Sequence, residues 1–228
     1  MYLVVGDEQD VLAREVCRQA GFSTLCSESE LLESFVTNSA GVERLRGAIV
    51  RPQRQRWQFT HSTLQSEDAE YHDRIASLYS FFTNLPCPVV NRFGLSWWVE
   101  DISYPWQLRI DLEAVLRLAN ERPHEKASYF GRFWPSARSV RPRTQSVYVS
   151  GGLVRAATDD AKSFEELVGS NAAALRKWQQ RTGVHLCRLD FDANPPIQLW
   201  HVEPFPMFDG EPEALVREIA IAALNVTA

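Results

Sequence analysis

Short apolar runs alternate with helix-like stretches over the first 50 residues, and this order constrains the fold more than any other feature. Tyr2–Val5, Phe22–Cys26 and Gly47–Val50 are runs of strand length. Val11–Ala20 carries apolar residues at helical spacing, and Ser27–Val36 opens with a capping box and continues with one apolar face. A strand, helix, strand, helix, strand order predicts a small parallel sheet.

The rest of the chain predicts a different kind of sheet. A tight Gly151-Gly152 turn between two alternating runs is typical of a β-hairpin, and two more strands flank a proline-rich turn further on. The predicted elements are helices over 67–82, 108–120, 164–181 and 212–224, and strands over 89–91, 146–150, 153–157, 186–191 and 198–203. We therefore expect an α/β fold with a parallel-sheet domain over 1–93, a short tryptophan-rich connection over 94–145, and a mixed or antiparallel α+β domain over 146–228.

Charge and composition exclude several classes of function. The formal net charge is −5, whereas affinity for nucleic-acid backbones comes mostly from clustered positive charge. No apolar run approaches the roughly 20 residues of a membrane helix, and the amino terminus turns acidic after a few residues. We expect a cytoplasmic protein that binds neither nucleic acid nor membranes.

The four cysteines are scattered and show no metal-binding or disulfide spacing. Buried free thiols are the favoured interpretation. They are Cys17, Cys26, Cys87 and Cys187.

An arginine-rich loop follows the third predicted strand, at the edge where open parallel sheets bind ligands. Arg51, Arg54 and Arg56 are its basic residues. Two interpretations stay open: the loop binds an anionic group of a substrate, or it is a solvated surface loop.

Three segments carry a resemblance to a known family. Pro88–Arg92 is similar to the strand that ends the amino-terminal domain of ATP-grasp ligases, and Val147–Val154 is similar to their glycine hairpin. Asp190–Phe208, with its HVEPFPMF run, resembles their metal-binding signature. In this order the segments resemble the ATP-grasp superfamily, particularly its branch of glutathione synthetases and ribosomal-protein glutamate ligases.

The resemblance implies a fold and a chemistry. In this family ATP lies between two sheets, and carboxylates of the second sheet hold magnesium ions. Transfer of a phosphoryl group to a carboxylate concentrates negative charge that metal ions and cationic side chains offset, and an amine then attacks the acyl phosphate. The resemblance makes Asn91 and Arg92 candidate substrate-binding residues.

The match to the metal-binding signature is partial. Asp190 stands at the first metal-binding carboxylate, but His201 replaces the bridging glutamate and Glu203 the following asparagine. His201 and Glu203 alternate on one strand, so both are predicted to face Asp190 across a divalent ion. Such a mixed set favours a transition metal over magnesium. The alternative is a polar strand face whose carboxylates are solvated or paired with arginine.

The cationic residues of the family are also reduced. Ser146 stands where the hairpin normally opens with a phosphate-contacting arginine, and Arg141 or Arg143 could substitute for it. The stretch between Asn91 and Val147, where the family inserts its nucleotide-covering lobe, has a single lysine, Lys126. This stretch has room for only about one helix and an irregular aromatic segment, so we expect most of that lobe to be missing. We take Arg143 and Lys126 as candidate catalytic residues.

These observations lead to three functional hypotheses. The first is a reduced, degenerate ATP-grasp protein, a pseudo-ligase that binds a protein or peptide partner as an accessory component, for example in peptide modification. The second is an active but atypical carboxylate–amine ligase that uses ATP with magnesium or manganese. The third is a metal-dependent enzyme on the same scaffold. A homodimer is also considered.

Overall fold

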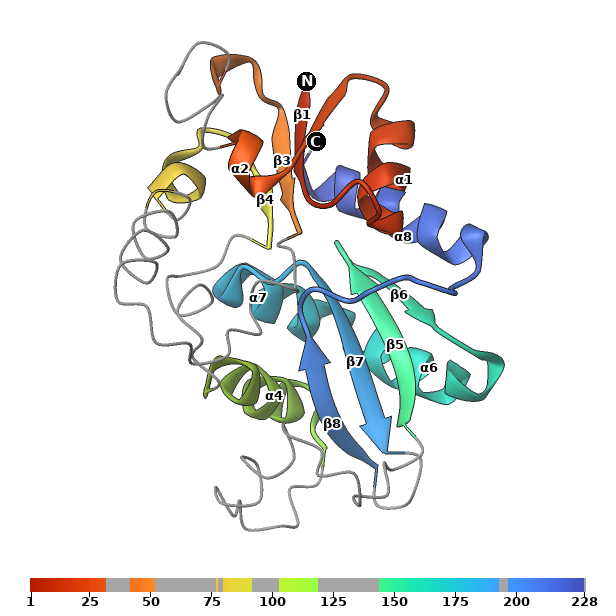
Figure 1. Ribbon diagram of the computed structural model, residues 1–228. Helices are drawn as coiled ribbons and strands as arrows, with labels where there is room; N and C mark the ends of the chain where they lie inside the picture. The colour runs from red at the N-terminus through yellow and green to blue at the C-terminus, as the bar shows by residue number, and fades with distance from the viewer. Residues whose placement is uncertain are drawn as a thin grey trace, which may run out of the picture.

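The computed structural model describes residues 1–31, 42–51, 77, 80–91, 103–118, 144–192 and 197–227. Within these ranges the chain forms two four-stranded sheets, each covered by helices (Figure 1). No helix in these ranges has the length and apolar character needed to span a bilayer.

The first sheet is parallel, as the alternation predicts, with strand order β2-β1-β3-β4. Its strands are β1 (Tyr2–Val5), β2 (Ser23–Cys26), β3 (Gly47–Val50) and β4 (Val89–Val90). The crossover helix α1 (Val11–Ala20) begins where the Asp10 carboxylate accepts a hydrogen bond from the Ala13 N–H. The short elements are α2 (Glu28–Leu31) and the 3-10 turn η2 (Val42–Arg44). The predicted capping box between Ser27 and Glu30 is confirmed.

The second sheet is antiparallel, with order β6-β5-β7-β8. Its strands are β5 (Thr144–Ser150), β6 (Leu153–Ala156), β7 (Leu186–Asp192) and β8 (Gln198–Glu203). The helices α4 (Ser103–Leu116), α6 (Lys162–Ser170) and α7 (Ala172–Thr182) share one apolar core with it, and η5 (Asp159–Ala161) precedes α6. Figure 1 shows α6 and α7 behind this sheet.

Two predicted helices differ from the observed ones. The single helix predicted over 164–181 is interrupted at Asn171, whose side-chain amide donates to the Leu167 carbonyl oxygen and competes with helix continuation. The helix predicted over 108–120 starts earlier, at Ser103, and stops at Leu116, because Arg117 adopts the left-handed conformation with φ 55°.

The last helix, α8 (Glu213–Val226), packs against both sheets (Figure 1). Its apolar residues share one core with side chains of β1, α1, β3, β5 and β7; Leu12, Ile49, Tyr148, Leu186 and Ile219 are members. The predicted division at residues 93 and 145 stays a prediction, and α8 joins the two sheets through a continuous core.

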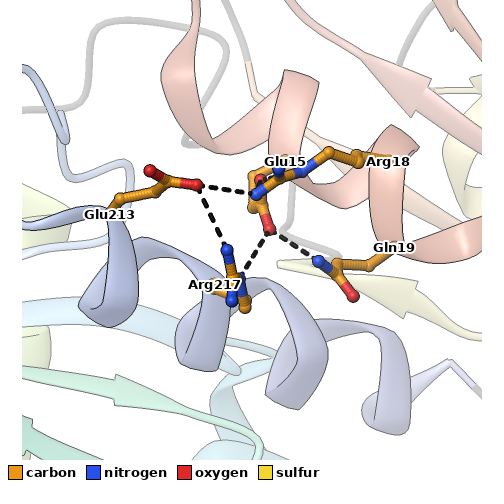
Figure 2. Close-up of polar contacts among 5 residues, drawn as sticks. All are labelled: Glu15, Arg18, Gln19, Glu213 and Arg217. Carbon is orange, nitrogen blue, oxygen red and sulfur yellow. Dashed lines mark hydrogen bonds and ion pairs between the residues drawn. The ribbon is translucent and has the colours of Figure 1, made fainter.

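Polar side chains on α1 and α8 complete this junction, as Figure 2 shows. Glu15 is only 8% exposed, and its carboxylate accepts from Arg18 Nε at 2.8 Å and from Gln19 Nε2 at 2.7 Å. Glu213 of α8 accepts from Arg18 Nη2 at 3.1 Å and from Arg217 Nη2 at 3.2 Å. The buried Glu15 carboxylate is therefore compensated by hydrogen-bonded partners, as burial of a charge requires.

Candidate functional site

Polar side chains gather on the face of the second sheet opposite to α6 and α7. The strand register pairs Ser146 with Asp190 and Asp190 with His201, and it pairs Tyr148 with Arg188 and Arg188 with Glu203. Cross-strand partners lie on the same face of a sheet. Two rows of three polar residues therefore cross β5, β7 and β8, and we call these six residues the polar face.

The first row is organised around the Asp190 carboxylate. Its Oδ1 accepts from Ser146 Oγ at 2.7 Å and from Arg188 Nε at 2.8 Å, and its Oδ2 accepts from Arg188 Nη2 at 3.1 Å. Asp190 is 7% exposed. A two-pronged arginine–carboxylate pair of this kind fixes both side chains, because two parallel hydrogen bonds define the orientation of both groups.

The second row connects this pair to the loop before α8. The Tyr148 hydroxyl donates to Glu211 Oε1 at 2.8 Å, and the Tyr148 ring stacks on Phe208 with centroids 4.8 Å apart. Burial, together with the Glu211 carboxylate, raises the pKa of Tyr148 above its usual value. Burial lowers the pKa of Arg188, but the Asp190 charge and the Tyr148 hydroxyl outweigh it and raise that pKa overall.

His201 and Glu203 lie at the β8 side of the polar face. His201 Nε2 is 3.7 Å from Glu203 Oε2, and Glu203 Oε1 accepts from the Phe205 N–H at 3.2 Å. The structure thus brings these two predicted metal ligands together, while the hydrogen bonds of Asp190 are directed at Arg188 and Ser146. In the described ranges no three histidine, cysteine or carboxylate side chains are grouped so as to hold a metal ion. The predicted metal set of Asp190, His201 and Glu203 stays a prediction.

Arg51, predicted to bind substrate, is buried where the two sheets meet. Its Nε donates to Asp10 Oδ2 at 2.6 Å, its Nη2 donates to the Pro206 carbonyl oxygen at 2.7 Å, and its guanidinium lies 5.6 Å from the Phe208 ring centroid. Arg51 therefore links the carboxyl end of β3 to the turn that follows β8.

Asn91, the other described substrate-binding candidate, has a similar location. Its side-chain amide donates to the carbonyl oxygens of Leu186 and Pro204 and accepts from the backbone N–H groups of His185 and Leu186. Two donated and two accepted bonds use the ordinary hydrogen-bonding capacity of an asparagine amide. The remaining candidates, Arg54, Arg92, Lys126 and Arg143, lie outside the described residues.

Sequence reasoning missed Arg188, which pairs with both carboxylate oxygens of Asp190. Its spacing gives a signal that could have identified it: Arg188 and Asp190 are two positions apart on one strand, so both side chains lie on the same face. The alternative interpretation of the signature, a strand face whose carboxylates pair with arginine, matches what the structure shows at Asp190.

No family model and no curated protein matches the sequence. Solved structures do match along the whole chain. The macrocyclase MdnC, bound with the precursor peptide MdnA from Microcystis aeruginosa MRC, has a TM-score of 0.61 and 10% identity over 98% of this chain and 99% of that one. The ATP-grasp ligase PsnB complexed with a minimal precursor has a TM-score of 0.59 and 12% identity, covering 100% of this chain and 98% of PsnB. The chain has the ATP-grasp fold.

A third ATP-grasp structure extends the comparison. It is a ligase from Chryseobacterium gregarium, described as RiPP-associated and in complex with ADP and a leader and core peptide, with a TM-score of 0.55 and 9% identity over 98% of this chain and 96% of that one. The ATP-grasp resemblance read from the three sequence segments is confirmed at the level of fold. Identities this low establish a common architecture only. The chemistry of this chain has to be argued from its own residues, here those of the polar face.

Proposed function

We propose that the chain binds a peptide and works as an accessory component of peptide modification, without carrying out ligase chemistry itself. The fold neighbours support the peptide part, because MdnC and the Chryseobacterium gregarium ligase were both solved with precursor, leader or core peptides. The peptide would contact the polar face, where Arg188 and His201 keep part of their side chains exposed.

One observation carries the proposal that ligase chemistry is absent. Asp190, at the position that the resemblance assigns to metal, is already bonded on both oxygens by Arg188 and on one by Ser146. Phosphoryl transfer relies on cationic groups and metal ions directed at the phosphates. On this face the Arg188 guanidinium and the Asp190 carboxylate pair with each other, so neither charge is directed at a phosphate. Such a face suits recognition of a polar ligand better than stabilisation of a phosphoryl group.

A peptide-display selection tests the binding function. Peptides enriched on the immobilised full chain would be resynthesised with a fluorophore, and their affinity would be measured by polarisation without ATP or metal. We expect His201→Ala to weaken binding by about tenfold, as loss of one good polar contact of about 1.4 kcal/mol does. Arg176→Ala, an exposed change on α7 behind the sheet, is the matched control and should have no effect. Equal loss with both variants, or enriched peptides that bind both variants like the wild type, would contradict a site on the polar face.

An active, atypical carboxylate–amine ligase is the second candidate. It is favoured by the match over the full length of PsnB, which has also been solved with Mg and ADP, and by the retention of Asp190. For that function ATP and magnesium or manganese would be the cofactors. It predicts formation of ADP that Asp190→Asn abolishes, whereas the accessory role predicts none.

A further inference from the structure

The ATP-grasp fold implies divalent metal ions at the Asp190 position, and the residues present do not fit them. A magnesium ion needs carboxylate oxygens with free lone pairs in a near-octahedral set, and a transition metal needs converging imidazole and carboxylate ligands. Both oxygens of Asp190 already accept charged hydrogen bonds, and no three ligating side chains in the described ranges form a cluster. We infer that the Arg188 guanidinium takes the place of the divalent cation, so that the protein itself fills the metal position of the fold.

The geometry of the pair supports this assignment. Arg188 Nε meets Oδ1 at 2.8 Å and Arg188 Nη2 meets Oδ2 at 3.1 Å, so the guanidinium spans the carboxylate. Ser146 Oγ approaches Oδ1 from the neighbouring strand at 2.7 Å. Three donors on one carboxylate leave little capacity for a metal ion, and a cation bound there would lie beside a fixed positive charge.

The surroundings hold Arg188 in this position. It lies on the central strand β7, between β5 and β8, and Asp190 is its neighbour on the same face. The Tyr148 hydroxyl interacts with its guanidinium, and Tyr148 is itself fixed by Glu211 and by stacking on Phe208. Burial lowers the pKa of Arg188, but attraction to Asp190 outweighs it and raises that pKa overall.

Glu203 and His201 are the side chains that should form a metal site with Asp190 once the arginine is removed. Glu203 is the register partner of Arg188, and His201 is the register partner of Asp190. His201 Nε2 and Glu203 Oε2 are 3.7 Å apart. In their present arrangement Asp190, His201 and Glu203 do not form a group that could hold a metal ion. We expect loss of the guanidinium to free the Asp190 oxygens beside the His201–Glu203 pair and to let the three side chains move together around an ion such as Mn²⁺. The inference concerns the metal alone and holds whether or not the face binds a peptide.

Manganese binding to the full chain tests the inference directly. Free Mn²⁺ would be followed by electron paramagnetic resonance during titration of the wild type, Arg188→Gln and the double variant Arg188→Gln with Asp190→Asn. We expect the wild type to bind no Mn²⁺ at millimolar concentration. Arg188→Gln should bind Mn²⁺ at concentrations at least about 100-fold lower, since one adjacent like charge is removed. The double variant should lose that binding.

Two results would overturn the inference. One is Mn²⁺ binding by the wild type that Asp190→Asn abolishes. This experiment does not depend on whether an Arg188 variant folds. The other is a folded Arg188→Gln variant that binds no Mn²⁺. Thermal unfolding checks the fold of each variant, and Arg188→Met, which keeps the aliphatic part of the side chain, replaces Arg188→Gln if the glutamine variant does not fold.

Discussion

The side-chain amide of Asn91 donates to the Leu186 carbonyl oxygen at 2.8 Å and accepts from the Leu186 backbone N–H, also at 2.8 Å. This reciprocal pair joins the end of β4 to the start of β7. Asn91 has a φ of 56°, a left-handed conformation that asparagine tolerates better than most residues. The strand that carries Arg188 and Asp190 is therefore anchored to the end of β4 in the parallel sheet.

Replacing Asn91 by alanine should destabilise the protein by about 2–4 kcal/mol. The change leaves buried backbone groups of His185, Leu186 and Pro204 without their partner and places alanine at a positive φ. Chemical denaturation with global fitting measures the difference. Asn225→Ala, an exposed change on α8, should stay within about 0.5 kcal/mol of the wild type. Similar stability of the two variants would contradict the role of Asn91.

Arg51 should behave as a buried link between the two sheets. Arg51→Met removes its bonds to Asp10 and Pro206 and leaves the Asp10 carboxylate without its buried partner. Breaking such a pair costs about 3–5 kcal/mol. Arg14→Met, at an exposed position of α1, is the control for urea denaturation. A loss of ligand binding at unchanged stability would instead support the predicted role of Arg51 in binding an anionic substrate.

Gly151 is required where the hairpin meets α8. A Cβ there would lie 2.4 Å from Val226 Cγ2 and 2.8 Å from the Ala222 carbonyl oxygen, and the residue has a φ of +54°. We expect Gly151→Ala to lower stability by about 1–3 kcal/mol through overpacking and backbone strain. Gly169→Ala, within α6 and with open space around it, should raise stability by about 0.5–1 kcal/mol. Thermal denaturation distinguishes the two signs, and equal shifts would contradict the close approach of α8.

Two buried thiols should make the protein less stable in alkali. Burial raises the pKa of Cys26 and of Cys187 from 9.0 to about 12. In the unfolded chain each thiol ionises from about pH 9, while the folded protein keeps the proton. Their contribution is complete below about pH 9 and is lost as the pH rises towards about 12, by about 1.4 kcal/mol per pH unit for each thiol. Urea denaturation across this window should show a shallower pH dependence for Cys187→Ala, and an unchanged slope would contradict the assignment.

Most of the fold could be predicted because it is specified locally. Apolar runs of four residues define β1 and β3, the Gly151-Gly152 turn defines the hairpin, and the capping box at Ser27 marks the start of α2. The interruption at Asn171 depends on one side-chain hydrogen bond that competes with the helix. The spacing of apolar residues, from which the helix was predicted, carries no information about such a bond.

The polar face could be predicted only in part. Strand alternation placed His201 and Glu203 on one face, but the partners of Asp190 come from a neighbouring strand and from its own strand. Similarly, Arg51 is a substrate-binding candidate because it follows a predicted strand, and Asn91 is one through the family resemblance. Their described partners lie far along the chain, at Pro206 and Leu186. Contacts between such distant residues are set by the packing of α8 and the two sheets against one another, which no local pattern encodes.

ADP formation distinguishes a peptide-binding accessory protein from an active ligase. The purified full chain would be incubated with ATP, magnesium or manganese, a peptide recovered by display and an amine acceptor, and ADP would be measured by a coupled assay beside Asp190→Asn. We expect the wild type to form no more ADP than the variant, because Arg188 and Ser146 engage the carboxylate that the family resemblance assigns to metal binding. ADP formation by the wild type that Asp190→Asn abolishes would contradict this expectation and identify an active ligase.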